Sequence, residues 1–314
     1  MKKTILATAI TALFAATAAQ AATVYEKDGT TVEVYGDIEV YAGNTIDDST
    51  GSLIELDDAD IGLDLGYDIG HNLTAIASIS YTAEDSNINL DESYVGVSSA
   101  DFGTLAIGQM VTVYDDAGIG SDYQFGWTSF YQTPDAGAQV VKYSLDKDMF
   151  YGAVAWLKSA DEGTGDDVNG VDGKIGVRVA DLDVTLFFAE GEVNFSDADP
   201  TIVDASNINI EARYTLDALE LAVAYSMGEK DNVVQGSVEQ DSFAVAATYQ
   251  LDDNIQFAGG VANIDNDAND DAILEYFVNT SYAFNSNVNA YVELGGSDAD
   301  DTELGYAAGM QVTF

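Results

Sequence analysis

The sequence is first informative through what it lacks. It has no cysteine, which excludes disulfides, a thiol nucleophile and any cysteine-based metal site. It has one histidine, His71, which argues against a site built from several histidines. Basic residues are scarce, with 10 Lys and Arg against 55 Asp and Glu and a formal net charge of -45. Nucleic acid is excluded as a partner, because phosphate binding needs clustered Lys and Arg.

Long apolar runs are also absent, apart from one near the start of the chain. That run, over residues 5–19, follows two lysines and ends in the small-residue sequence Ala19-Gln20-Ala21, which is typical of a secretory signal peptide. We therefore predict a signal peptide over residues 1–21 and a mature domain over residues 22–314. Losing the two lysines leaves 8 basic residues and a net charge of -47. No later run reaches about 18 apolar residues, so any part that spans a membrane does so as strands.

What the chain does have is a large apolar content, 47% of its residues, arranged with a period of two. In residues 304–314, for example, apolar side chains alternate with small or polar ones, as in a strand with one apolar face. About sixteen such segments follow one another, most of them about ten residues long, which is the length of a tilted strand in a bilayer. They lie near residues 31–43, 58–68, 73–83, 89–99, 104–113, 138–145, 149–158, 173–181, 183–193, 206–216, 220–229, 241–251, 255–264, 272–284, 288–297 and 304–314.

The segments between these strands alternate in length. Short turns are predicted at residues 69–72, 100–103, 146–148, 252–254 and 285–287. Long acidic loops are predicted at residues 44–57, 114–137, 159–172, 194–205, 230–240, 265–271 and 298–303. Short turns on one rim and long loops on the other are typical of bacterial outer-membrane barrels. The predicted fold class is therefore all-β, a transmembrane antiparallel β-barrel of about sixteen strands.

Aromatic residues lie on the apolar faces, close to strand ends, and predict two girdles at the membrane interfaces. They are Tyr67, Tyr81, Tyr94, Tyr143, Trp156, Phe188, Tyr214, Tyr249, Phe257, Tyr276, Tyr282, Tyr306 and Phe314. The alternative is a soluble β-sandwich or β-barrel with one face as its core. Sixteen one-sided strands would then need two very large sheets, or a closed ring with a polar lumen.

Several short stretches, in order along the chain, resemble the Gram-negative general porins, and most of all those of marine Vibrio-type bacteria. They are Val24-Tyr-Glu-Lys-Asp-Gly29, Val32-Glu-Val-Tyr-Gly36, Tyr94-Val-Gly-Val97, Asp101-Phe-Gly-Thr-Leu-Ala-Ile-Gly108, Val113-Tyr-Asp115, Val141-Lys-Tyr-Ser144 and the terminal Phe314. No single stretch is decisive, but their order and spacing together are specific, and the resemblance covers essentially the whole mature chain.

This resemblance implies a sixteen-stranded barrel that assembles as a homotrimer in the outer membrane, after export through the periplasm. Its partners would be outer-membrane lipid and lipopolysaccharide, small hydrophilic solutes and cations. Each barrel would be a water-filled diffusion channel with no catalytic activity and no cofactor. The third loop, about residues 114–137, would fold inward and narrow the pore, so that its acids face the opposite wall.

Within this loop we expect Asp116 and Asp122 to face the lumen. The family usually has an acid at the loop tip, and here Gln124 stands in its place. On the opposite wall, alternation turns Asp37 and Glu39 of the first strand inward, with Asp58 and Asp60 of the second. In the fourth strand, an outward Tyr94 turns Asp91 and Ser93 inward.

Family members commonly have Lys or Arg at the positions that match Asp37, Asp60 and Asp91. Here only Lys142, on the sixth strand, keeps a basic residue at a matching position, while Lys174, Arg178 and Arg213 also alternate inward. Because an acidic ring in a narrow channel concentrates cations, the sequence predicts a cation-selective pore. The alternative is that these acids only solvate the lumen, or that crowding leaves them partly protonated. We predict no metal site, since the Asp-rich loops lack the spacing of a calcium loop.

Three other functions stay open at this point. A substrate-specific porin, for oligosaccharides for example, would need an aromatic path, to which Tyr35, Tyr41, Trp127 and Phe130 could contribute. A surface receptor or adhesin would use the acidic loops to meet a partner. A soluble, exported acidic β protein would need no membrane at all.

Overall fold

The structure is a computed structural model that describes residues 21–46, 53–84, 87–127, 133–160, 167–194, 202–232, 236–267 and 271–314. Residues 1–20 of the predicted signal peptide lie outside this description. So do Phe130 and parts of the predicted long loops.

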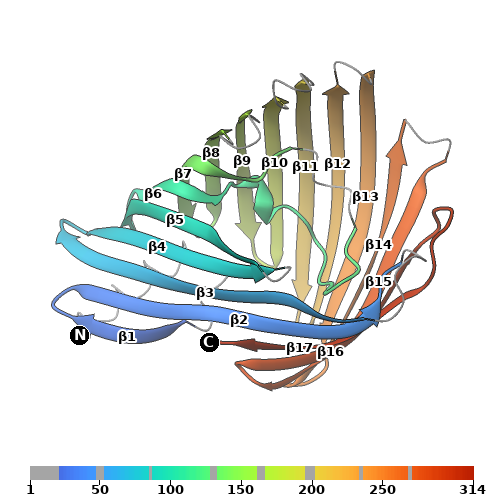
Figure 1. Cartoon of the computed structure of the whole chain (residues 1–314), viewed down its shortest axis with the longest axis horizontal. Coiled ribbons are helices and arrows are strands. Elements are labelled where there is room, and N and C mark those ends of the chain that lie inside the picture. The colour runs from blue at the N-terminus through green and yellow to red at the C-terminus, as the bar shows by residue number, and fades with distance from the viewer. Residues whose placement is uncertain are drawn as a thin grey trace.

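The described chain consists almost entirely of β-strands, arranged side by side in a single sheet (Figure 1). The strands are β1 (Ala22–Lys27), β2 (Thr30–Asn44), β3 (Leu53–Gly70), β4 (Leu73–Glu84), β5 (Asn87–Ser99), β6 (Gly103–Val111), β7 (Ala136–Lys147), β8 (Phe150–Ala160), β9 (Asp167–Val179), β10 (Leu182–Asn194), β11 (Ile202–Leu216), β12 (Leu219–Asn232), β13 (Gly236–Gln250), β14 (Ile255–Asn266), β15 (Ile273–Asn285), β16 (Val288–Ser297) and β17 (Gly305–Thr313). One short 3-10 helix, η1 (Tyr114–Asp116), follows β6. In the described ranges, no helix is long and apolar enough to cross a membrane.

The sheet closes on itself as an antiparallel barrel. Each strand from β2 to β17 pairs with the next one, and β17 pairs back with β2, which gives a closed ring of sixteen strands. The additional strand β1 takes no position of its own in this ring. Ala22 of β1 pairs with Val34, and Phe314 exchanges backbone hydrogen bonds with Gly36 (2.9 and 3.0 Å), so β1 and β17 lie end to end along one edge of β2. The predicted fold class is thus confirmed, and β1 is the strand that the sequence pattern missed.

The two faces of the barrel wall have opposite character. In β11, Ile208 and Ile210 are 49% and 46% exposed, whereas Asn209 and Glu211 between and beside them are 0% and 3% exposed. A soluble protein would bury the isoleucines and expose the polar side chains. The exposed apolar face and the polar face match a barrel whose outside meets lipid.

The predicted girdle residues lie on the apolar face, with one exception. Twelve of the thirteen are 37–55% exposed, whereas Tyr94 is 7% exposed. The prediction for Tyr94 is wrong because β5 contains an irregularity: Ser93 pairs with Ile79, but Leu90 pairs with Tyr81. The extra residue shifts the alternation, so Tyr94 lies on the polar face opposite Ser78, and Ser93 lies on the apolar face.

Several strands extend further into the predicted long loops than the sequence indicated. β3 begins at Leu53, β9 at Asp167 and β13 at Gly236, about five residues earlier than expected in each case. Backbone pairing continues in these stretches, because a strand satisfies its hydrogen bonds through its neighbour whether or not its side chains alternate in polarity. The alternation of apolar residues therefore underestimates the full length of these strands.

Candidate functional site: the polar face of the barrel

Three carboxylates predicted from the sequence stand together on β2 and β3. Asp37 pairs directly with Asp60, and one oxygen from each of Asp37, Asp58 and Asp60 lies within 4.8 Å of the others. Gln311 of β17 donates a hydrogen bond to Asp37 (3.2 Å), while Asp60 has one buried oxygen with no hydrogen-bond partner. Among the ion pairs found in the described residues, none includes any of these three. We call them the acidic group; like charges placed opposite each other in a sheet are unfavourable, so this arrangement is not explained by stability.

Two further predicted acids lie near this wall but are held by hydrogen bonds. Glu39 pairs with Asp58 across the strands, is 7% exposed and accepts a hydrogen bond from the Tyr291 hydroxyl (2.6 Å). Asp91 of β5 accepts one from Ser80 (3.0 Å), whose side chain is on the polar face. Each of these two carboxylates therefore has a hydroxyl donor on the barrel wall.

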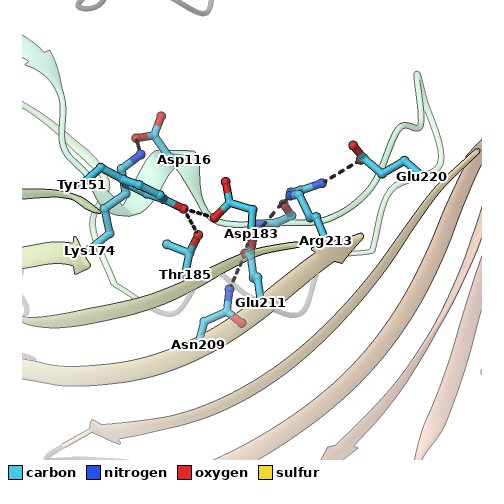
Figure 2. A network of polar contacts seen from close by, with 10 residues as sticks. Asp116, Tyr151, Lys174, Asp183, Thr185, Asn209, Glu211, Arg213 and Glu220 are labelled. Carbon is cyan, nitrogen blue, oxygen red and sulfur yellow. Dashed lines mark hydrogen bonds and ion pairs between the residues drawn. The ribbon is translucent and has the colours of Figure 1, made fainter. Parts of the chain in front are cut away.

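The predicted basic residues lie on β7, β9 and β11. Figure 2 shows the polar contacts of Lys174 and Arg213 among side chains of η1 and of the neighbouring strands. Lys174 of β9 forms an ion pair with Asp116 of η1 and lies 5.7 Å from the centre of the Phe187 ring. Lys142 of β7 donates to the carbonyl of Val111 (2.9 Å). Two of the predicted site residues, Asp116 and Lys174, are thus brought together.

The two arginines are each shared between two carboxylates. Arg213 of β11 lies 3.4 Å from Glu211 and 3.7 Å from Glu220, and it also donates to the carbonyl of Gly118. Arg178 of β9 contacts Asp146 (2.8 Å) and Asp183 (3.2 Å).

Arg178 is also set apart from the other predicted residues. Its guanidinium stacks 4.0 Å from the centre of the Tyr151 ring, beside the turn between β7 and β8. It therefore lies near one rim of the barrel, and not beside η1 with Lys174.

The segment after β6 is bound to the barrel wall by three buried carboxylates that the sequence analysis did not single out. Asp172 of β9 accepts from the amide of Val113 (3.0 Å), and Glu211 of β11 accepts from the amide of Gly118 (2.6 Å). Glu293 of β16 accepts from three successive amides, those of residues 123–125, at 2.7–2.8 Å. The three side chains are only 2–3% exposed, so these charge-assisted hydrogen bonds are shielded from water.

The tip of this segment explains why Gln124 replaces the acid expected there. Its side-chain amide donates to Asp57 (2.6 Å) and to the Tyr291 hydroxyl (3.2 Å). A carboxylate at this position would face Asp57 at hydrogen-bond distance, whereas the amide supplies a donor. The stacked rings of Tyr123 and Tyr291, with centroids 3.8 Å apart, complete the contact.

Two aspartates of the segment titrate at higher pH than usual. Burial, with help from Asp135 and Asp116, raises the pKa of Asp115 to about 6, although Lys142 acts in the opposite direction. Burial also raises the pKa of Asp122, and nearby Glu293 adds to that effect. Asp122 therefore lies near the Glu293 anchor.

A signal for the missed anchors was present in the sequence. Glu293 stands between Val292 and Leu294, which are 52% and 45% exposed on the apolar face, and Asp172 stands between Val171 and Gly173. A carboxylate inside an otherwise apolar strand carries a burial cost unless it has partners. Alternation alone could thus have marked both residues as polar-face groups with a dedicated role.

Comparison with known proteins agrees with this geometry. The profile of the family described as Gram-negative porin matches residues 7–302. The porin-like protein H of Photobacterium profundum is 33% identical over the whole length of both chains.

Solved structures show the same fold at lower identity. A loop-deletion mutant of the outer membrane protein OmpT of Vibrio cholerae has a TM-score of 0.81 at 20% identity, covering 91% of this chain and 100% of that one. The trimer form of OmpT has a TM-score of 0.78 at 18% sequence identity, with the same coverage of both chains. The anion-selective porin of Comamonas acidovorans has a TM-score of 0.72 at 16% sequence identity, and the match again covers 91% of this chain and 100% of that one.

A closed antiparallel barrel with an apolar outer band, a full-length relative and a family match over nearly the whole sequence lead to one conclusion. The chain belongs to the Gram-negative porin family and is a multi-pass β-barrel of the outer membrane.

Proposed function

We propose that the barrel is a water-filled, cation-selective channel for passive diffusion of ions and small hydrophilic solutes. The segment after β6 narrows it from within. In support, Asp172, Glu211 and Glu293, which bind this segment, lie on strands as far apart around the ring as β9 and β16. All three are buried positions of the polar face, which a segment outside the barrel could not reach together.

The acidic group is the observation that carries the proposed selectivity. Asp37, Asp58 and Asp60 have no basic partner among the described ion pairs, whereas Lys174 and Arg213 each contact a carboxylate. The negative charge of the wall is thus left for mobile ions, while the positive charge is largely neutralised. A fold shared with an anion-selective porin does not oppose this, since selectivity follows the charges on the wall.

The assembly belongs to the same proposal. A solved relative with this fold is described in a trimer form, and we propose a homotrimer here, surrounded by outer-membrane lipid and lipopolysaccharide. Chemical cross-linking of the purified protein in detergent tests this, with a three-subunit band expected.

Reversal potential in a planar bilayer under a KCl gradient tests the selectivity. The unchanged protein is expected to prefer K⁺, more strongly at low salt, because screening is then weaker. The triple variant Asp37→Asn, Asp58→Asn, Asp60→Asn is expected to lose most of this preference.

A matched control removes three charges elsewhere. The control is the triple variant Asp253→Asn, Asp271→Asn, Asp300→Asn, whose three positions are exposed and lie in connecting segments. It is expected to keep its preference for K⁺. Anion preference of the unchanged protein, or equal effects of the two triple variants, would contradict the proposal.

A further inference from the structure

The part of the barrel wall that contacts the tip of the segment after β6 carries very small side chains. Ile119 and Trp127 of the segment pack there with Phe277 of β15. The small residues beneath them, here called the alanine patch, are Ala222 and Ala224 of β12, Ala244 and Ala246 of β13, and Ala258 and Ala262 of β14. None of the six is more than 5% exposed. Here the wall carries methyl groups where the same face elsewhere carries polar side chains, so it fits an apolar partner from the segment.

Within this patch, Gly260 leaves the room that Trp127 occupies. A Cβ atom at Gly260 would lie 2.5 Å from the Trp127 ring and 2.8 Å from the Phe277 ring against which the indole packs, closer than side chains approach one another. The ring is 8% exposed and is tilted against Phe277 with centroids 5.4 Å apart. A single methyl group at this position therefore competes directly with the seated indole.

A second gap of the same kind lies on β16 and β17. Gly295 and Gly305 pair directly across the two strands, and a Cβ atom at either would overlap the ring of Phe125. The amide of Phe125 donates to Glu293, two residues before Gly295 on the same face. The carboxylate and the glycine gap thus hold the backbone and the side chain of the same residue.

We infer that Gly260 and Gly295 determine the size selectivity of the channel, by setting how close the segment lies to the wall. This inference rests on the proposed function, in which the segment narrows the pore. The aromatic rings are rigid and the packing is close, so an added methyl group moves the ring and its backbone away from the wall. In a closed barrel, movement away from the wall is movement into the channel.

Single-channel conductance of Gly260→Ala and Gly295→Ala tests the inference. Each is expected to conduct roughly 1.5- to 2-fold less than the unchanged protein and to admit only smaller sugars in liposome swelling. Gly259→Ala is the matched control, because Gly259 is the neighbouring residue and its added Cβ would meet β15 and not the segment. Its conductance is expected to stay unchanged.

The opposite substitution tests the same contact from the side of the segment. Trp127→Leu replaces the indole by a smaller side chain, which allows the segment to lie closer to β14. The channel is then wider, so its conductance is expected to rise. Combining it with Gly260→Ala is expected to bring conductance back toward that of the unchanged protein, as coupled neighbours do. This arm also applies if a glycine variant fails to fold, which heat-modifiable mobility on a gel reveals.

Two results overturn the inference: unchanged conductance in the folded glycine variants, or an unchanged conductance in Trp127→Leu. Both leave the proposed function intact if the unchanged protein still prefers K⁺. The proposed function is tested by a separate measurement, the reversal potential of the unchanged protein. It is contradicted if that protein shows no preference for K⁺.

Discussion

Two walls of the same barrel treat charge in opposite ways. On β2 and β3, Asp37, Asp58 and Asp60 stand together, and Asp37 is paired in register with a like charge. On β9 and β11, Lys174 and Arg213 are in contact with carboxylates and with the segment after β6. Lys174 and Arg213 thus help to hold the segment, while no ion pair among the described residues gives the acidic group a basic partner. In the proposed channel, we therefore expect the pairing of charges, more than the net charge of the chain, to set the ion preference.

Replacing the acidic group by basic residues gives the largest expected effect. Asp37→Arg with Asp60→Arg changes the β2–β3 wall by four charge units and places cations opposite each other. We expect the ratio of K⁺ to Cl⁻ permeability to fall by roughly tenfold or more, to anion preference, as measured by reversal potential. A variant that still prefers K⁺ would show that selectivity is set elsewhere.

Releasing a basic residue on the other wall gives the next largest effect. In Asp116→Asn, Lys174 loses its ion-pair partner and its ammonium becomes available to anions. The permeability ratio is expected to fall by roughly twofold, as one full charge is uncovered. Lys174→Gln in the same background removes the released charge and is expected to restore the ratio, and failure to restore it argues against this reading.

A smaller effect is expected on acidification. The pKa of Asp115 is raised to about 6, so lowering the pH from 7.5 to 5 neutralises this group while carboxyls of ordinary pKa stay ionised. Cation preference is expected to decline over this range, and Asp115→Asn is expected to show a lower preference at pH 7.5 and a flatter response. His71→Gln serves as control, because His71 lies in the turn between β3 and β4 and should leave the response unchanged.

The smallest effect is expected at Arg178, which is shared between Asp146 and Asp183 beside a turn at the rim. Arg178→Gln removes a charge that is already neutralised, so the permeability ratio is expected to rise by less than about 1.5-fold. If the permeability ratio instead rose by about the factor by which it is expected to fall in Asp116→Asn, ion pairing would not explain the difference between the two walls.

The alternation of apolar residues was enough to predict the barrel, its strand order and the faces of most strands. It failed at Tyr94, because the irregularity in β5 is a property of pairing with β4 that no single strand reveals. It also missed β1, which is exposed along its whole length and has no buried face to give a pattern.

The site was predictable only in part, for a physical reason. Alternation identified which side chains share the polar face, and it included all members of the acidic group. It could not identify the partner of each charge, because Asp116 meets Lys174 only after a segment of irregular structure has crossed to another strand. Alternation could have marked Glu293 as a polar-face carboxylate, but it could not identify its partners, which are backbone amides 168–170 residues away.

The shared edge of β2 has a consequence for how the barrel forms. The β1–β2 hairpin needs only a tight turn, whereas β17 must find β2 across the longest separation between paired strands of the described chain, up to the 276 residues between Asp37 and Thr313. Contacts this distant in sequence form slowly, because much chain entropy is lost before they contribute. Until they form, β2 and β17 each expose an unpaired edge, which invites pairing with another chain. Ring closure is therefore the late and vulnerable step of folding, and β1 already covers part of the edge at which it takes place.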